Sequence, residues 1–142
     1  MPYDAYPNDL IRSILTQVKT IALVGASNNP ARDSNGVLAY LKHKGYRMFP
    51  VNPGLTGQEI HGLTVYGKLA DIREPIDMVD VFRNSEAAAS VVDEALLLAP
   101  LPKVIWMQLG VRHDAAAAKA EAKGVKVIMN RCPKIEYSRL IG

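Results

Sequence analysis

The sequence predicts an α/β fold, a three-layer, doubly wound parallel sheet that forms a single domain over residues 1–142. Short apolar runs alternate along the whole chain with segments in which apolar residues recur at helical spacing. The runs are apolar at consecutive positions, as at Thr20–Val24, which is typical of strands buried on both faces of a parallel sheet. At 142 residues the chain is also long enough to bury a substantial core.

Five strands and five helices are expected. The strands are short apolar runs, each followed by a turn or loop: 20–24, 46–51, 78–82, 103–107 and 125–129. The helices begin at residues that favour a helix N-terminus: Asn8 or Asp9, Ser34, Ser85, Asp114 and Pro133. Residues 55–70 are rich in glycine, and we expect one helical turn at 58–60 and a short strand at 64–66 there.

The order of these elements predicts where a ligand binds. Right-handed crossovers place the strand at 20–24 inside the sheet, next to the strand at 78–82. In such Rossmann-like sheets a ligand binds at the carboxyl ends of the strands, at the switch point between these two. Candidate residues therefore lie in the loops that follow Val24, Val51, Phe82, Met107 and Met129.

The loop at 25–34 has the composition of an anion-binding turn. Gly25 permits a tight turn at the strand end, and the backbone amides near the following helix favour a negative group. We take these loop residues as candidates for binding a phosphate: Gly25, Ala26, Ser27, Asn28, Arg32 and Ser34. The alternative is that Gly25 only ends the strand and that Arg32 is a solvated loop residue.

The second strand lacks the acid that NAD-binding folds place at its end to hold a ribose hydroxyl. It ends at Val51-Asn52-Pro53, three further candidate site residues, and no Asp or Glu lies between Asp33 and Glu59. The missing acid argues against NAD. It suits a nucleotide whose ribose carries a phosphate, such as NADP or coenzyme A.

The later loops supply further candidates. Phe82 and Arg83 end the strand at the switch point, where Arg83 can meet a phosphate or form an ion pair with Asp80. The loop after the fourth strand can line a slot for an extended chain such as pantetheine, through Trp106, Gln108 and Gly110. A plain core position is an equal alternative for the tryptophan.

Composition and charge argue against several classes of protein. The net charge of +3 comes without clusters of Lys or Arg, so we expect no nucleic-acid partner. No apolar run approaches the roughly 20 residues of a membrane helix, and the N-terminus lacks the features of a secretory signal. The single cysteine fits a reducing compartment, and we expect a cytoplasmic protein.

The sequence offers no recognisable catalytic arrangement. It has no metal-ligand spacing, no Ser–His–Asp arrangement and no paired carboxylates, and His43, His61 and His113 all lie away from the expected strand ends. We therefore expect no metal, no catalytic residue and no enzymatic activity.

Segments spread over nearly the whole chain match one known family in order and spacing. They are Val24-Gly25-Ala26-Ser27 with Asn29-Pro30 and Arg32; Gly45-Tyr46; Pro50-Val51-Asn52-Pro53; Gly57, Gly62 and Tyr66; Asp80-Val81-Phe82-Arg83; residues 104–110; and Gly124 with Asn130-Arg131-Cys132. On these residues the chain resembles the stand-alone CoA-binding domain proteins of bacteria and archaea. Those proteins are similar to the CoA-binding domain of the succinyl-CoA synthetase alpha subunit.

The resemblance implies that coenzyme A lies at the carboxyl ends of the strands. Its diphosphate would lie on residues 25–34, and Asn52 and Pro53 would border its adenosine. Phe82 and Arg83 would lie near the nucleotide, and the pantetheine arm would face residues 106–110. The function implied is non-catalytic binding of coenzyme A or an acyl-CoA. Two alternatives remain, an NADP-binding oxidoreductase and a regulatory nucleotide-binding subunit.

Cys132 is the one candidate reactive group. It precedes Pro133 at an expected helix N-terminus, a position that favours a thiolate. We therefore consider that it lies near the ligand pocket and forms a mixed disulfide with coenzyme A. The alternative is a small buried packing residue, which is the common role of a free cysteine.

Overall fold

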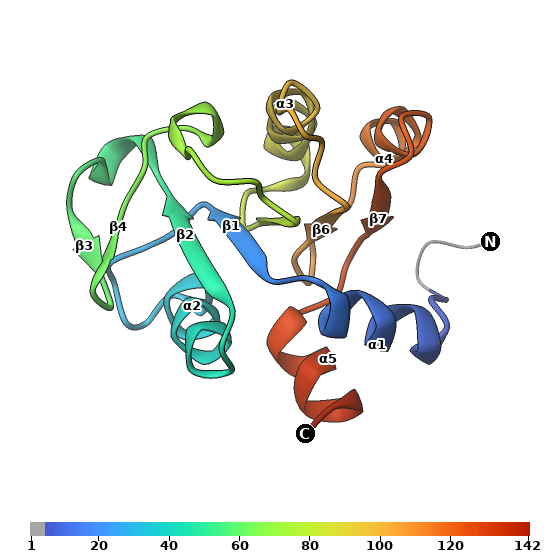
Figure 1. The fold of residues 1–142 in the computed structure, drawn as a ribbon, viewed down its shortest axis with the longest axis horizontal. Coiled ribbons are helices and arrows are strands. Elements are labelled where there is room, and N and C mark those ends of the chain that lie inside the picture. The colour runs from blue at the N-terminus through green and yellow to red at the C-terminus, as the bar shows by residue number, and fades with distance from the viewer. Residues whose placement is uncertain (1–4) are drawn as a thin grey trace.

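The computed structural model describes residues 5–142 and contains the predicted doubly wound sheet (Figure 1). Five strands lie in the order β2-β1-β5-β6-β7, and every neighbouring pair is parallel. β1 lies inside the sheet with β2 on one side and β5 on the other. The predicted switch point between β1 and β5 is therefore confirmed.

The strands of this sheet begin and end within one residue of the expected positions: β1 Thr20–Val24, β2 Arg47–Val51, β5 Met78–Val81, β6 Val104–Met107 and β7 Lys126–Ile128. The helices around them are α1 Asn8–Gln17, α2 Asp33–His43, α3 Ser85–Ala95, α4 Asp114–Glu121 and α5 Pro133–Leu140. None of these helices is long and apolar enough to cross a membrane, a finding that covers residues 5–142.

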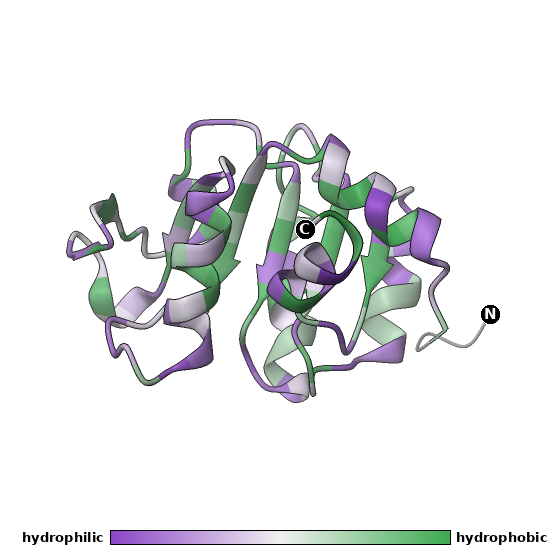
Figure 2. Ribbon diagram, turned by 90° about the horizontal axis from the view of Figure 1, so that it is seen from below, coloured by the Kyte–Doolittle hydropathy of each residue, from purple (hydrophilic) through white to green (hydrophobic). Residues whose placement is uncertain are grey.

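Helices cover both faces of the sheet, and this explains why the strands are apolar at consecutive positions. In Figure 1, α3 and α4 lie on one side of the sheet, while α1, α2 and α5 lie on the other. Alternate residues of β1 serve the two cores: Ala22 packs with the side of α3 and α4, and Leu23 with the other side. Figure 2 shows the resulting pattern, with hydrophobic strands between helices that carry hydrophilic residues.

The residues expected to cap the helices were wrong in most cases. Asn84, one residue before Ser85, caps α3, and its Oδ1 accepts from the amide of Ala87 at 2.8 Å. His113, one residue before Asp114, caps α4, and its Nδ1 accepts from the amide of Ala116 at 3.0 Å. These two residues have extended backbone, which a capping side chain requires, whereas the expected ones already lie in the first turn.

The other two expected caps were also wrong. α2 has Arg32 at its N-cap without a side-chain capping bond, and Ser34 lies inside the first turn with 6% of its surface exposed. α1 begins after Pro7 instead of after a capping Asn8 or Asp9. Pro133 does open α5, as expected.

The glycine-rich connection after β2 forms a small antiparallel hairpin. A short 3₁₀ turn at Pro53–Leu55 precedes β3 (Glu59–Ile60) and β4 (Leu63–Thr64). The helical turn expected at 58–60 was therefore wrong, and the strand expected at 64–66 begins one residue earlier. Tyr66 continues alongside β2 through a bridge to Val51, so the hairpin is attached to the edge of the main sheet.

Candidate functional site

A cavity of about 560 Å³ lies at the switch point, at the carboxyl ends of β1, β2 and β5. Eight of the candidate site residues line it, from three separate loops: Gly25, Ala26, Ser27, Arg32, Ser34, Asn52, Phe82 and Arg83. Ala31 and Asp33 complete the lining. The fold thus brings together residues up to 58 positions apart in the chain, Gly25 and Arg83 being the extremes.

Gly25 is required where the backbone leaves β1 for the cavity. Its φ is +96°, a conformation that side chains disfavour, and its amide donates to the carbonyl of Val51 at 2.9 Å. A Cβ at this position would lie only 2.3 Å from the carbonyl oxygen of Phe82. The glycine therefore lets the loop pass directly over the end of β5.

Asn52 fixes the shape of this loop from the neighbouring strand. Its Nδ2 donates to the carbonyl of Ala26 at 2.7 Å, and its Oδ1 accepts from the amide of Gly54 at 2.8 Å. Both ends of the side chain amide are thus engaged within the protein. Asn52 replaces the acid of NAD-binding folds with a group that holds the loop.

Asn35 is a site-building residue that the sequence analysis missed. Its Nδ2 donates to the carbonyl of Ser27 at 2.9 Å, and its Oδ1 lies 2.9 Å from Nε2 of His61. Only 6% of Asn35 is exposed. Because His61 belongs to the turn between β3 and β4, Asn35 connects that hairpin to the loop at the cavity, a contact between segments that no local pattern signals.

Replacing Asn35 by alanine is expected to lower the free energy of unfolding by about 1–3 kcal/mol, because the carbonyl of Ser27 loses its donor and the His61 ring keeps only its contact with the backbone carbonyl of residue 35, at 3.2 Å. Urea denaturation followed by circular dichroism measures this. The exposed Asn28 in the same loop is the control, and Asn28→Ala should change the stability by less than about 0.5 kcal/mol. Equal effects of the two substitutions would contradict the assigned role of Asn35.

The charged groups of the cavity favour an anion. Arg32 and Arg83 are exposed, and neither side chain forms an ion pair with any residue of the part that the structure describes. Asp33 is the one acidic residue in the lining. The first turn of α2 also lies at this cavity, through Asp33 and Ser34, and the N-terminus of a helix attracts negative groups.

Asp80 does not pair with Arg83, which was the alternative for that arginine. The Asp80 side chain is completely buried on β5, and within residues 5–142 neither of its carboxylate oxygens has a hydrogen-bond partner. Burial away from water raises the pKa of Asp80 well above its ordinary value. The carboxyl group therefore stays protonated at pH values well above its ordinary pKa. In that pH range it contributes no charge to the cavity.

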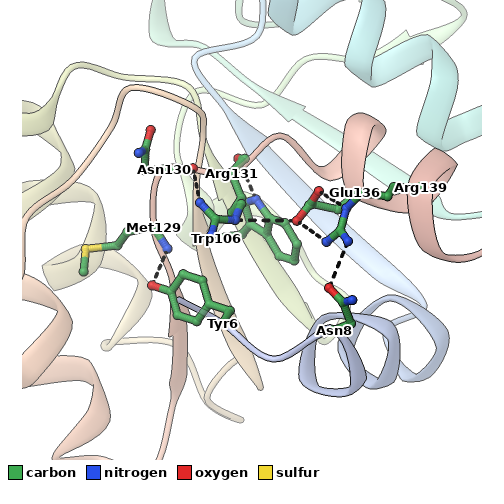
Figure 3. Close-up of polar contacts among 8 residues, drawn as sticks. All are labelled: Tyr6, Asn8, Trp106, Met129, Asn130, Arg131, Glu136 and Arg139. Atoms are coloured by element: carbon green, nitrogen blue, oxygen red, sulfur yellow. Dashed lines mark hydrogen bonds and ion pairs between the residues drawn. The ribbon is translucent and has the colours of Figure 1, made fainter. Parts of the chain in front are cut away.

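Trp106 lies in the core and not along a ligand slot, so that candidate was wrong. It has no exposed surface, and it packs on the side of the sheet that α1, α2 and α5 cover. Its Nε1 donates to the carbonyl of Arg131 at 2.9 Å, as Figure 3 shows. Alternation along β6 turns this side chain into the helix layer, where the indole fixes the segment before α5.

Five further candidates lie outside the lining of the first cavity. Val51 is buried and takes part only through its carbonyl, which accepts from Gly25 and Ala26. Asn28 and Pro53 are exposed beside the cavity, and the amide of Gly110 is held by Asn130 Oδ1 at 2.7 Å. Gln108 lines a second cavity, which adjoins the first.

Comparison with known proteins gives a consistent result. The sequence profile of the family described as CoA binding domain matches residues 19–138. Protein YneT of Bacillus subtilis (strain 168) is 39% identical over 129 residues, which cover 90% of this chain and 92% of that protein.

Two solved structures are also similar. A hypothetical protein from Pyrococcus horikoshii OT3 is 38% identical with a TM-score of 0.92, over 100% of this chain and 97% of that one. A Thermus thermophilus protein, cell-free ID.343, is 37% identical with a TM-score of 0.90, over 96% and 100% of the two chains. The matched residues cover every strand of the sheet and the whole cavity, and the chain therefore belongs to the CoA-binding domain family.

Proposed function

We propose that this chain binds coenzyme A or an acyl-CoA in the cavity at the switch point and catalyses no reaction on it. The observation that carries the proposal is the pair of arginines, Arg32 and Arg83, which line the cavity without an ion-pair partner among residues 5–142. Unpaired guanidinium groups beside a helix N-terminus form a site for phosphate. Membership of the CoA-binding domain family supports the choice of ligand.

The diphosphate of the ligand lies on the loop that begins at Gly25. The tight turn there brings backbone close to a ligand, as nucleotide-binding turns require. Ser27 holds the amide of Asn29 through its Oγ at 3.1 Å, and its hydroxyl proton is directed by rotation to a phosphate oxygen. The first turn of α2 adds its backbone amides.

The end of β2 favours a phosphorylated ribose over a free one. NAD-binding folds place a carboxylate at this position, and here the strand ends at Val51 and Asn52. A carboxylate would repel a ribose phosphate, whereas the amide of Asn52 carries no charge. Coenzyme A has a phosphate on its ribose, and the two arginines supply charge to bind it.

A non-catalytic role is supported by the composition of the lining. The ten lining residues include two serines, Ser27 and Ser34, but no histidine, lysine, tyrosine or cysteine, so the lining holds no histidine or lysine base to activate a serine. The carboxylate of Asp33 is the only acidic group there. A lining of this kind is better suited to binding an anion than to general acid–base catalysis.

Replacing Arg32 or Arg83 by alanine is expected to weaken binding of coenzyme A by about 10- to 100-fold each, the effect of losing a charge-assisted hydrogen bond. Isothermal titration calorimetry measures the dissociation constants. Arg73→Ala is the control, because it removes the same charge from an exposed position outside the cavity lining. If all three variants bind like the unsubstituted protein, the arginines do not hold the ligand and the proposal is wrong.

A further inference from the structure

A second cavity, of about 370 Å³, adjoins the first on the side of the sheet that α2 and α5 cover. The two cavities share Ala31, Arg32 and Asp33, at the start of α2. A ligand held by its phosphates in the first cavity can therefore extend past this segment into the second. The second cavity differs in composition, and its distinctive lining residues are Val37, Gln108, Leu109, Cys132, Lys134 and Ile135.

Gln108 gives the second cavity an acceptor for an amide N–H group of a ligand. Only 9% of its surface is exposed, and its Oε1 has no hydrogen-bond partner in residues 5–142. A buried amide oxygen without a donor costs about 1–3 kcal/mol, so a ligand that brings an N–H group recovers this free energy. The arm of coenzyme A carries two amide groups between its phosphates and its thiol.

Apolar side chains stand at the rim of the same cavity. Leu109 and Ile135 are 56% and 53% exposed, unusually high for large hydrophobic residues, and both line the cavity together with the buried Val37. Methylene groups that cover these side chains would remove apolar surface from water. The cavity thus combines an unsatisfied amide oxygen with an apolar rim, which matches an arm of amides and methylenes.

Cys132 lies in this cavity, and its position is fixed. Its thiol is buried, with 7% of the residue exposed, immediately before α5. The neighbouring Arg131 accepts from Trp106 through its carbonyl and pairs with the buried Glu136 at 3.5 Å (Figure 3). Arg32 and Lys134 also line this cavity and give it positive charge.

We propose that Cys132 is a site of covalent capture, at which the thiol exchanges with the disulfide form of coenzyme A. The Cys132 sulfur loses its proton and attacks one sulfur of the disulfide. A new bond joins Sγ to one coenzyme A, and the other coenzyme A leaves as a thiolate that takes up a proton. No electrons are gained or lost overall. This inference rests on the proposed function, since the nucleotide half must bind first.

The test is intact-protein mass spectrometry of the purified full chain after incubation with coenzyme A disulfide. Since the sequence has one cysteine, any disulfide adduct is at Cys132. We expect one coenzyme A per chain, formed on the order of 100-fold faster than the adduct with oxidised glutathione, because binding raises the local concentration of the reacting disulfide. Adenosine 3′,5′-bisphosphate, which has no thiol, should slow only the coenzyme A reaction.

Two variants separate recognition from simple exposure of the thiol. Cys132→Ser should give no adduct, with folding verified by circular dichroism. Gln108→Leu keeps the thiol and removes the amide, so it should slow the reaction with coenzyme A disulfide and leave the reaction with oxidised glutathione unchanged. Equal rates with the two disulfides, or no adduct, would overturn the inference.

A separate titration with reduced coenzyme A distinguishes this failure from failure of the proposed function. Suppose that reduced coenzyme A binds, but that no adduct forms or that the adduct forms equally fast from coenzyme A disulfide and oxidised glutathione. In that case the inference about Cys132 is wrong, and the proposed binding of coenzyme A stands. Absence of binding by reduced coenzyme A means that the proposed function is wrong, and the inference with it.

Discussion

Gly25→Ala is expected to abolish binding of coenzyme A and to lower the free energy of unfolding by about 2–5 kcal/mol. Two causes add. The residue has a φ of +96°, which strains any side chain, and the new Cβ would lie 2.3 Å from the carbonyl oxygen of Phe82. That oxygen belongs to backbone at the end of β5, so either β5 or the loop must move, and both form the wall of the cavity.

Gly45→Ala is the matched control for this prediction. Gly45 has nearly the same φ, +99°, and a Cβ added there meets nothing within 4 Å. This variant should therefore lose only about 1–2 kcal/mol from backbone strain. It should bind coenzyme A like the unsubstituted protein, because Gly45 lies outside the cavity lining. Urea denaturation and calorimetry give both quantities, and normal binding by Gly25→Ala would contradict the assigned close approach of the loop to β5.

Asp80→Asn is expected to stabilise the protein at neutral pH. The buried carboxyl group of Asp80 has no partner among residues 5–142, and burial raises its pKa well above the ordinary value. In the unfolded chain the same group ionises near its ordinary pKa. Above that pH the folded protein must keep a proton that the unfolded chain releases, so folding becomes less favourable as the pH rises.

The raised pKa of Asp80 makes the free energy of unfolding depend on pH in a measurable way. The contribution of Asp80 to stability is intact below the ordinary pKa of an aspartate, and it falls by about 1.4 kcal/mol per pH unit as the pH rises toward the raised pKa. Asparagine cannot ionise, so the difference in unfolding free energy between Asp80→Asn and the unsubstituted protein should grow across that range. A pH-independent difference for Asp80→Asn would contradict the account.

The sheet and most of the first cavity could be predicted from the sequence because their signals are local. The consecutive apolar residues of Thr20–Val24 indicate burial on both faces, and Gly25 marks the turn at the strand end. The sequence also showed that Asn52 stands where NAD-binding folds have an acid. These signals needed only the rule that ligands bind at the carboxyl ends of parallel strands.

The remaining features depend on contacts between distant segments. Trp106 faces the layer of α1, α2 and α5 because side chains alternate along β6. The sequence could not indicate this, because the face of the sheet that these helices cover is decided by the tertiary structure. Asn35 was missed because its partners are Ser27 and His61, 8 and 26 residues away in the chain. The caps shifted to Asn84 and His113 because backbone conformation decides between neighbouring polar residues.

The most direct test of the central claim is calorimetric titration of the full chain with coenzyme A, dephospho-coenzyme A, NADP and NAD. We predict that coenzyme A binds most tightly and that loss of the ribose phosphate weakens binding by about tenfold or more, because Arg32 and Arg83 lose a charged partner. NADP and NAD should bind more weakly than coenzyme A. Clear binding of NADP with none of coenzyme A would contradict the account and would favour the NADP-binding alternative.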